Sequence, residues 1–187
     1  MIQLMWGEAL AAIAKQKEDG SYDSFNEFPR CVENALNLIT TKGEKKEAKV
    51  EGGGLEAVKY ANNAYALEMS FRMGKENGKK RTLPFSEDEI DGVVDGIYAL
   101  RVQPEDKTSG GLSVMEVIIS TEDTFTAADG AIKKVTFDFI KPERNNAGEK
   151  VPTIDWDPIP ELLAPIVGTE ENASSPASKN GSGAVKS

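Results

Sequence analysis

The clearest pattern in this chain is an alternation of apolar and polar residues between positions 65 and 73. The apolar set consists of Tyr65, Leu67, Met69, Phe71 and Met73, and the intervening set of Ala66, Glu68, Ser70 and Arg72. Successive side chains of a β-strand face opposite sides of the sheet. The pattern therefore predicts a strand with one buried face and one face in water.

A shorter alternation precedes it and predicts a second strand of the same kind. Ala48 and Val50 alternate there with Glu47, Lys49 and Glu51. Gly52, Gly53 and Gly54 follow, and glycine adopts backbone conformations that are closed to other residues. We therefore expect a long hairpin over residues 43–63, with the three glycines at its tip.

Further strands are predicted along most of the chain. They cover residues 36–40, 97–103, 112–120 and 131–141, and residues 22–28 are expected to be extended. Asp129-Gly130 is a strong hairpin signal before the last of these strands. Turn signals at intervals of roughly eight to twelve residues are typical of β-sandwiches and barrels. The chain is thus predicted to be mainly β.

Two segments are less regular. Residues 3–16 are rich in alanine, which favours a helix by propensity, whereas the family resemblance described below favours a strand that begins near Trp6. Ser86, with Glu89 three residues later, resembles the capping box that begins a helix. Gly92 interrupts the apolar positions that follow, so at most one short helix is expected there.

The pattern changes after Pro142, and we divide the chain accordingly. Residues 1–142 form the predicted β domain. Residues 143–167 are a proline-rich C-terminal arm that we expect to be irregular and to pack against another surface. Residues 168–187 have the composition of a disordered tail.

Composition narrows the classes of function. The chain has 187 residues, with 31 acidic and 22 basic side chains and a net charge of −9. Proteins that grip nucleic acid do so with basic patches, which this balance disfavours. The first residues lack the basic and apolar regions of a signal peptide, and no window has the roughly 18 apolar residues of a membrane span. We expect synthesis and folding in a cytoplasm, with no membrane span.

No recognisable catalytic apparatus is present. The chain has no histidine and a single cysteine, Cys31, which excludes histidine-dependent triads and thiolate zinc sites. The acidic run from Glu87 to Asp95 lacks the closing ligand of a calcium loop, because Tyr98 stands at the twelfth position. The three glycines lack the Gly-Lys-Ser/Thr of a phosphate loop. We expect no enzymatic activity, no metal and no cofactor.

Several segments carry a resemblance to a known family. The pattern G-E-K-K-E-A-K-V-E-G-G, beginning at Gly43, resembles tail tube proteins of long-tailed bacteriophages. So does D-G-V-V-D-G-I-Y-A-L-R over residues 91–101. Residues 121–130 with the strand after them resemble the family's penultimate hairpin, and Trp6-Gly7 fits as well. The resemblance covers roughly residues 3–142.

This resemblance implies a structural virion protein. Family members form six-fold rings that stack into the hollow tube through which phage DNA passes during ejection. Their fold is a β-sandwich or barrel with one short helix and a long hairpin. The resemblance implies self-association, contacts with tape measure, terminator and baseplate or tip proteins, and a place in the virion tail after assembly in the bacterial cytoplasm.

Two groups of candidate residues follow. The hairpin between subunits or rings is assigned to Gly43, Glu44, Glu47, Glu51, Gly52, Gly53 and Gly54. A tube wall that passes DNA must not hold it, so carboxylates are expected to outnumber basic groups around the bore. The candidates for this wall are Glu47, Glu51, Glu68, Glu116 and Asp138. Lys49, Arg72 and Lys134 are then expected to pair with acids or to turn away.

Three other interpretations stay open at this stage. Tubes of contractile tails and type VI secretion share the fold implied by the resemblance, and a terminator or connector protein at the tail end is a second alternative. From a different class, a monomeric β-barrel that binds a small ligand would need an enclosed apolar cavity with convergent polar groups.

Overall fold

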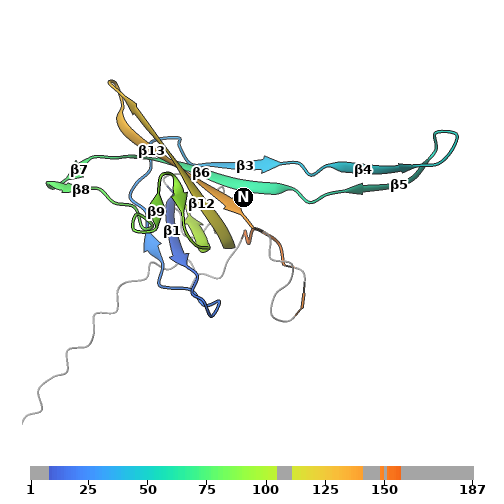
Figure 1. Ribbon diagram of the computed structural model, residues 1–187, viewed down its shortest axis with the longest axis horizontal. Helices are drawn as coiled ribbons and strands as arrows, with labels where there is room; N and C mark the ends of the chain where they lie inside the picture. Colours follow the sequence, from blue (N-terminus) through green and yellow to red (C-terminus); the bar gives the residue numbers. More distant parts are fainter. Residues whose placement is uncertain (1–8, 105–110, 141–147, 150, 157–187) are drawn as a thin grey trace, which may run out of the picture.

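The computed structural model describes residues 9–104, 111–140, 148–149 and 151–156, and within them it is built from β-strands (Figure 1). The strands are β1 (Leu10–Lys15), β2 (Asn26–Glu27), β3 (Asn37–Thr41), β4 (Lys45–Lys49), β5 (Leu55–Tyr60), β6 (Ala64–Arg72), β7 (Lys75–Glu76), β8 (Lys79–Lys80), β9 (Glu89–Ile90), β10 (Val93–Val94), β11 (Tyr98–Gln103), β12 (Leu112–Thr126) and β13 (Gly130–Phe139). The mainly β prediction is confirmed. No helix of the described residues is long and apolar enough to cross a membrane.

One antiparallel sheet organises the molecule. Its strand order is β2-β1-β11-β12-β13-β6-β3, and the small β9–β10 hairpin joins β12 beside this path. The sheet is open, with β2 and β3 at its two ends, so it is not a closed barrel. The β12–β13 pairing, from Val117↔Phe139 to Thr126↔Gly130, is its longest regular ladder.

The core lies on one face of this sheet. The alternating residues Leu67, Met69 and Phe71 of β6 are buried there, as the sequence pattern predicts. Phe28 stacks on Phe71 with ring centroids 5.3 Å apart and meets Phe137 edge-on at 5.6 Å. These aromatic pairs fix the loop that contains Phe28 over the sheet.

The opposite face of β11 is covered by the segment between β1 and β2. The Arg101 guanidinium lies 3.6 Å from the centre of the Phe25 ring, a distance typical of a cation–π contact. The Tyr22 hydroxyl donates a hydrogen bond to the Met115 carbonyl at 2.6 Å. Burial raises the pKa of Tyr22, so its hydroxyl stays protonated and able to donate.

The helix predicted after Ser86 does not form within the described residues. Instead, residues 84–88 make turns, and Asp91 and Gly92 have positive φ angles of 48° and 84° between β9 and β10. Two consecutive positive φ angles define the hairpin turn that matches strand twist. The capping-box prediction was wrong because the Ser86 hydroxyl accepts a hydrogen bond from the Leu83 amide, which precedes it, rather than capping later residues.

The segment after β13 returns to the sheet. The Ser113 amide donates to the Asp155 carbonyl at 2.8 Å and the Asp155 amide donates back at 2.9 Å, and Ile154 is buried in the core. Residues 168–187, which the sequence predicts to be a disordered tail, and Trp6-Gly7 lie outside the described residues.

Candidate functional site: a projecting hairpin and an acidic sheet face

The hairpin of residues 43–63, called the arm below, projects from the body (Figure 1). β4 and β5 pair with each other and with no other described strand. Gly52 and Gly53 stand at its tip with φ angles of 97° and 84°, as expected for the glycine turn. The prediction that residues 47–51 have one buried face was wrong, because both faces of β4 are exposed.

The arm continues the β3–β6 hairpin across a narrow joint. The Ala61 amide donates to the Glu44 carbonyl at 2.8 Å, and the Gly43 amide donates to Asn63 Oδ1 at 3.1 Å. A Cβ atom at Gly43 would lie 2.1 Å from the Ala61 carbonyl oxygen. Only glycine therefore fits where the two strands approach. This steric limit explains the first glycine of the G-E-K-K-E-A-K-V-E-G-G pattern.

The arm's surface is both apolar and charged. Lys45 pairs with Glu47, and Lys42 lies 5.7 Å from the Tyr60 ring centre. Its exposed apolar side chains are Val50, Leu55, Val58 and Tyr60. A lone two-stranded hairpin is marginally stable in water, so an arm of this composition is expected to be completed by another surface.

The second candidate region is the solvent-facing side of the sheet, called the outer face below. It is formed by the residues of β12, β13, β6 and β3 that alternate with the core residues. Register places Asp138 between Ile118 and Ala66, and Thr136 between Ser120 and Glu68. Glu116 precedes this ladder at the irregularity of β12. Three predicted wall residues, Glu68, Glu116 and Asp138, thus share one face, whereas Glu47 and Glu51 lie apart on the arm.

Carboxylates predominate on the outer face. Lys134 Nζ lies 2.7 Å from Glu68 Oε1, and this hydrogen bond raises the pKa of Lys134. Arg72 lies 3.8 Å from a carboxylate oxygen of Asp129 and donates to the Asp129 carbonyl at 2.7 Å. Two of the three cations that were expected to be paired or turned away, Arg72 and Lys134, are therefore paired. The third, Lys49, lies on the arm at the end of β4 and not on this face. Glu116 and Asp138 form no ion pair with another described residue.

Sequence analysis missed one member of this face, Glu122. It stands opposite Lys134 in the β12–β13 ladder and favours the charged form of that lysine. The strand was predicted to end at residue 120, but β12 continues to Thr126. The three threonines and the phenylalanine of T-E-D-T-F-T were the available signal, since β-branched and aromatic residues favour strands.

Two carboxylates of the acidic run at residues 87–95, Asp88 and Glu89, form hydrogen bonds with side chains of the sheet. Asp88 accepts hydrogen bonds from Lys15 Nζ at 2.5 Å and from the Tyr98 hydroxyl at 2.9 Å. Glu89 accepts from Lys133 Nζ at 2.5 Å and from the Thr121 hydroxyl at 2.6 Å. These two carboxylates fasten the β9–β10 hairpin to the sheet, a structural role.

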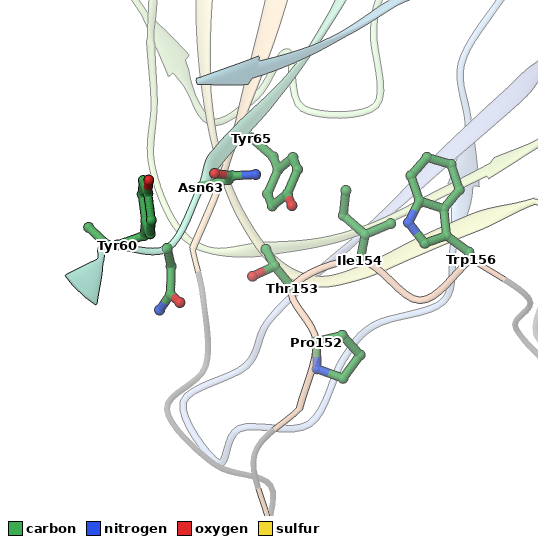
Figure 2. Close-up of a pocket in the computed structure, with 9 residues that line it drawn as sticks. Tyr60, Asn63, Tyr65, Pro152, Thr153, Ile154 and Trp156 are labelled. Carbon is green, nitrogen blue, oxygen red and sulfur yellow. The ribbon is translucent and has the colours of Figure 1, made fainter. Parts of the chain in front are cut away.

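A surface groove of about 570 Å³ lies where the arm meets the body (Figure 2). Tyr60 and Asn63 line it from the arm, and Pro152, Ile154 and Trp156 line it from the returning segment. Its lining has no charged side chain and no enclosed apolar chamber of the kind that a small-ligand barrel requires. The groove instead shows that the base of the arm lies beside residues 152–156.

Comparisons with known proteins give little further guidance. Neither a protein-family model nor a curated protein matches the chain. A solved structure with a similar fold is the sheath/tube terminator of the extracellular contractile injection system PVC, in its extended state. The identity is 10% and the TM-score 0.43, over 74% of this chain and 93% of that one. A likeness this distant carries no argument about function.

Proposed function

We propose that this chain is a structural subunit of a phage tail tube. Copies of it form six-fold rings, and the rings stack into the conduit for DNA ejection. Tape measure, terminator and baseplate or tip proteins are then its partners at the ends of the tube. The assembled protein is located in the virion tail, and it needs neither a catalytic site nor a cofactor.

The arm is the observation that supports the proposal most strongly. It carries the G-E-K-K-E-A-K-V-E-G-G pattern that resembles the family, and it projects with both faces exposed. A monomeric binding protein gains nothing from ordering about twenty residues that bury almost no surface, because conformational entropy opposes it. In an assembly, the same hairpin gains the surface of a neighbour to pack against.

The outer face supports the role in DNA passage. Its cations are neutralised by ion pairs, and its remaining charges are carboxylates. Repeated around a narrow channel, charges of one sign create a strong field of that sign. Such a wall repels phosphates, so DNA slides through it without being held.

Size-exclusion chromatography with light scattering tests the proposal. We expect the purified chain to form rings or tubes whose mass is a multiple of six subunits, and negative staining to show a central hole. A chain that remains monomeric at high concentration contradicts the proposal and favours the small-ligand alternative.

A further inference from the structure

The β9–β10 hairpin is held rigidly on its inner side. Val94 is buried in the core, and Glu89 beside it is fixed by Lys133 and Thr121. The Gly92 carbonyl also accepts a hydrogen bond from the Thr121 amide at 2.9 Å. The outward side chains of this hairpin are therefore displayed in one fixed orientation.

Those outward side chains are apolar. Ile90 is 76% exposed and Val93 is 69% exposed, and the two stand opposite each other across the hairpin. These two exposed β-branched side chains, at the edge of the sheet where Val93 pairs with Ser120 of β12, form an apolar surface on a rigid support that suits a protein contact.

The surroundings of this surface are acidic. The segment S-E-D-E-I-D-G-V-V-D-G over residues 86–96 has no basic residue. Glu87, Asp91 and Asp95 are exposed, and none forms an ion pair with another described residue. A partner that covers Ile90 and Val93 is therefore favoured if it brings positive charge.

The arm carries a face of the opposite character. Lys46 and Lys59 are direct cross-strand partners, and neither forms an ion pair with another described residue. Like charges directly opposite each other destabilise a hairpin. The next pair on the same face is Ala48 and Ala57, whose small apolar side chains allow close approach. Acids laid over the two lysines would offset this repulsion.

We infer that the arm of one copy docks through this face onto the β9–β10 hairpin of a second copy. Lys46 and Lys59 then meet Glu87 and Asp95, while Ala48 and Ala57 cover Ile90 and Val93. The contact is intermolecular because β4 and β5 pair only with each other and the arm points away from the body (Figure 1). The inference rests on the proposed function and names the surfaces that join its subunits.

Charge reversal on each side tests the contact in the full-length chain. Lys46→Glu/Lys59→Glu and Glu87→Lys/Asp95→Lys are each expected to weaken assembly about a hundredfold, because like charges then meet across the interface. The four substitutions combined restore opposite charges and are expected to recover most of the assembly. Sedimentation velocity across a concentration series measures each effect.

A matched control uses Lys75 and Lys80, which are direct cross-strand partners in the β7–β8 hairpin. Lys75→Glu/Lys80→Glu makes the same change in net charge and is expected to leave assembly unchanged. Circular dichroism shows whether each variant is folded, and the arm variants should retain the wild-type melting temperature because the arm pairs only with itself.

The outcomes separate the contact from the proposed function. If the wild type assembles but the reversals have no effect, or if the combined variant is no better than either one, the contact is wrong and the tube proposal stands. If the combined variant recovers oligomers that are not six-fold rings, the contact stands and the tube proposal fails. A wild type that never self-associates overturns both.

Discussion

At the residue scale, the ion pair of Lys133 with Glu89 is the least exposed one among the described residues. The two side chains are each only 12% exposed, and Lys133 Nζ also lies 3.1 Å from Asp123. Burial opposes the charged form of Lys133, but the hydrogen bonds to Glu89 and Asp123 outweigh burial and raise its pKa. Lys133 therefore holds β9 to the β12–β13 ladder.

Removal of this charge should be costly because it leaves Glu89 buried without a counterion. We expect Lys133→Met to lower the free energy of unfolding by about 2 kcal/mol in urea denaturation. The double variant Lys133→Met/Glu89→Gln should lose less of the free energy of unfolding, because it also removes the buried carboxylate that would have no counterion. Lys75→Met, at an exposed site, is the control. A loss of less than about 0.5 kcal/mol for Lys133→Met, typical of surface substitutions, contradicts this role.

Asp88 predicts an acid-sensitive contribution to stability. Its hydrogen bond with Lys15 holds the pKa of Asp88 below its ordinary value, with a smaller contribution from Tyr98. A carboxyl whose folded-state pKa is depressed stabilises the fold above its unfolded-state pKa of about 3.9 and loses that effect as the pH falls through the folded value.

Asp88→Asn should therefore be less stable than the wild type at pH 7, by about 1 kcal/mol for a partly exposed pair. The difference should shrink as the pH falls below about 4. Urea unfolding of both proteins at pH 7, 4 and 3 measures it. A difference that stays constant across this range would show that the ion pair contributes nothing.

At the element scale, the arm's glycine tip gives the sharpest test of its role. Valines at Gly52, Gly53 and Gly54 force β-branched residues into positive φ angles at the first two positions. We expect the body to stay folded, because β4 and β5 pair with no other described strand, and ring or tube formation to be lost. Gly20→Val, in a turn with a φ of 80° and open space around it, is a matched control. Normal tubes from the triple variant would refute the arm's role in assembly.

Elements with local signals could be predicted from the sequence. The alternation at residues 65–73, the glycine turn at 52–54 and the Asp129-Gly130 turn all correspond to elements of the structure. The β9–β10 hairpin was not predicted, because its pairing with β12 depends on distant partners such as Lys133. The exposure of β4 was also missed, since alternation shows that a strand has two unlike faces but does not show what covers either one.

The candidate site was predicted only in part for the same reason. Glu68, Glu116 and Asp138 are far apart in sequence, and their common face follows from the alternation of their strands. The extension of β12 to Glu122 depends on the partner strand β13, which single-strand patterns do not specify. The Lys46–Lys59 register likewise required the paired strands.

At the scale of the whole molecule, assembled tubes are expected to repel DNA. Wild-type tubes should not retain duplex DNA, because a carboxylate-rich wall repels phosphates. Tubes of Glu116→Lys/Asp138→Lys should bind it, with an affinity that falls steeply as salt is raised. Glu18→Lys/Glu33→Lys makes the same change in net charge at exposed sites outside the sheet strands and is the control. Filter binding at several salt concentrations measures the difference, and salt-sensitive binding to wild-type tubes would refute the acidic wall.

The arm and the tip of the β12–β13 hairpin project from opposite ends of the sheet. The arm continues from the Ala64 end of β6, whereas the tip lies beyond the Arg72 end, where Arg72 pairs with Ile132. Each subunit therefore presents different projections at its two ends. Contacts between unlike surfaces generate rings when the rotation closes and filaments when it does not.

Cryo-electron microscopy of the particles formed by the wild-type chain tests whether the protein builds a tail tube. We expect hollow tubes of stacked six-fold rings, with the outer face of β12, β13, β6 and β3 around the bore and each arm ordered against another subunit. Particles without a central channel, or tubes whose bore is lined by a different and net positive surface, would contradict this expectation.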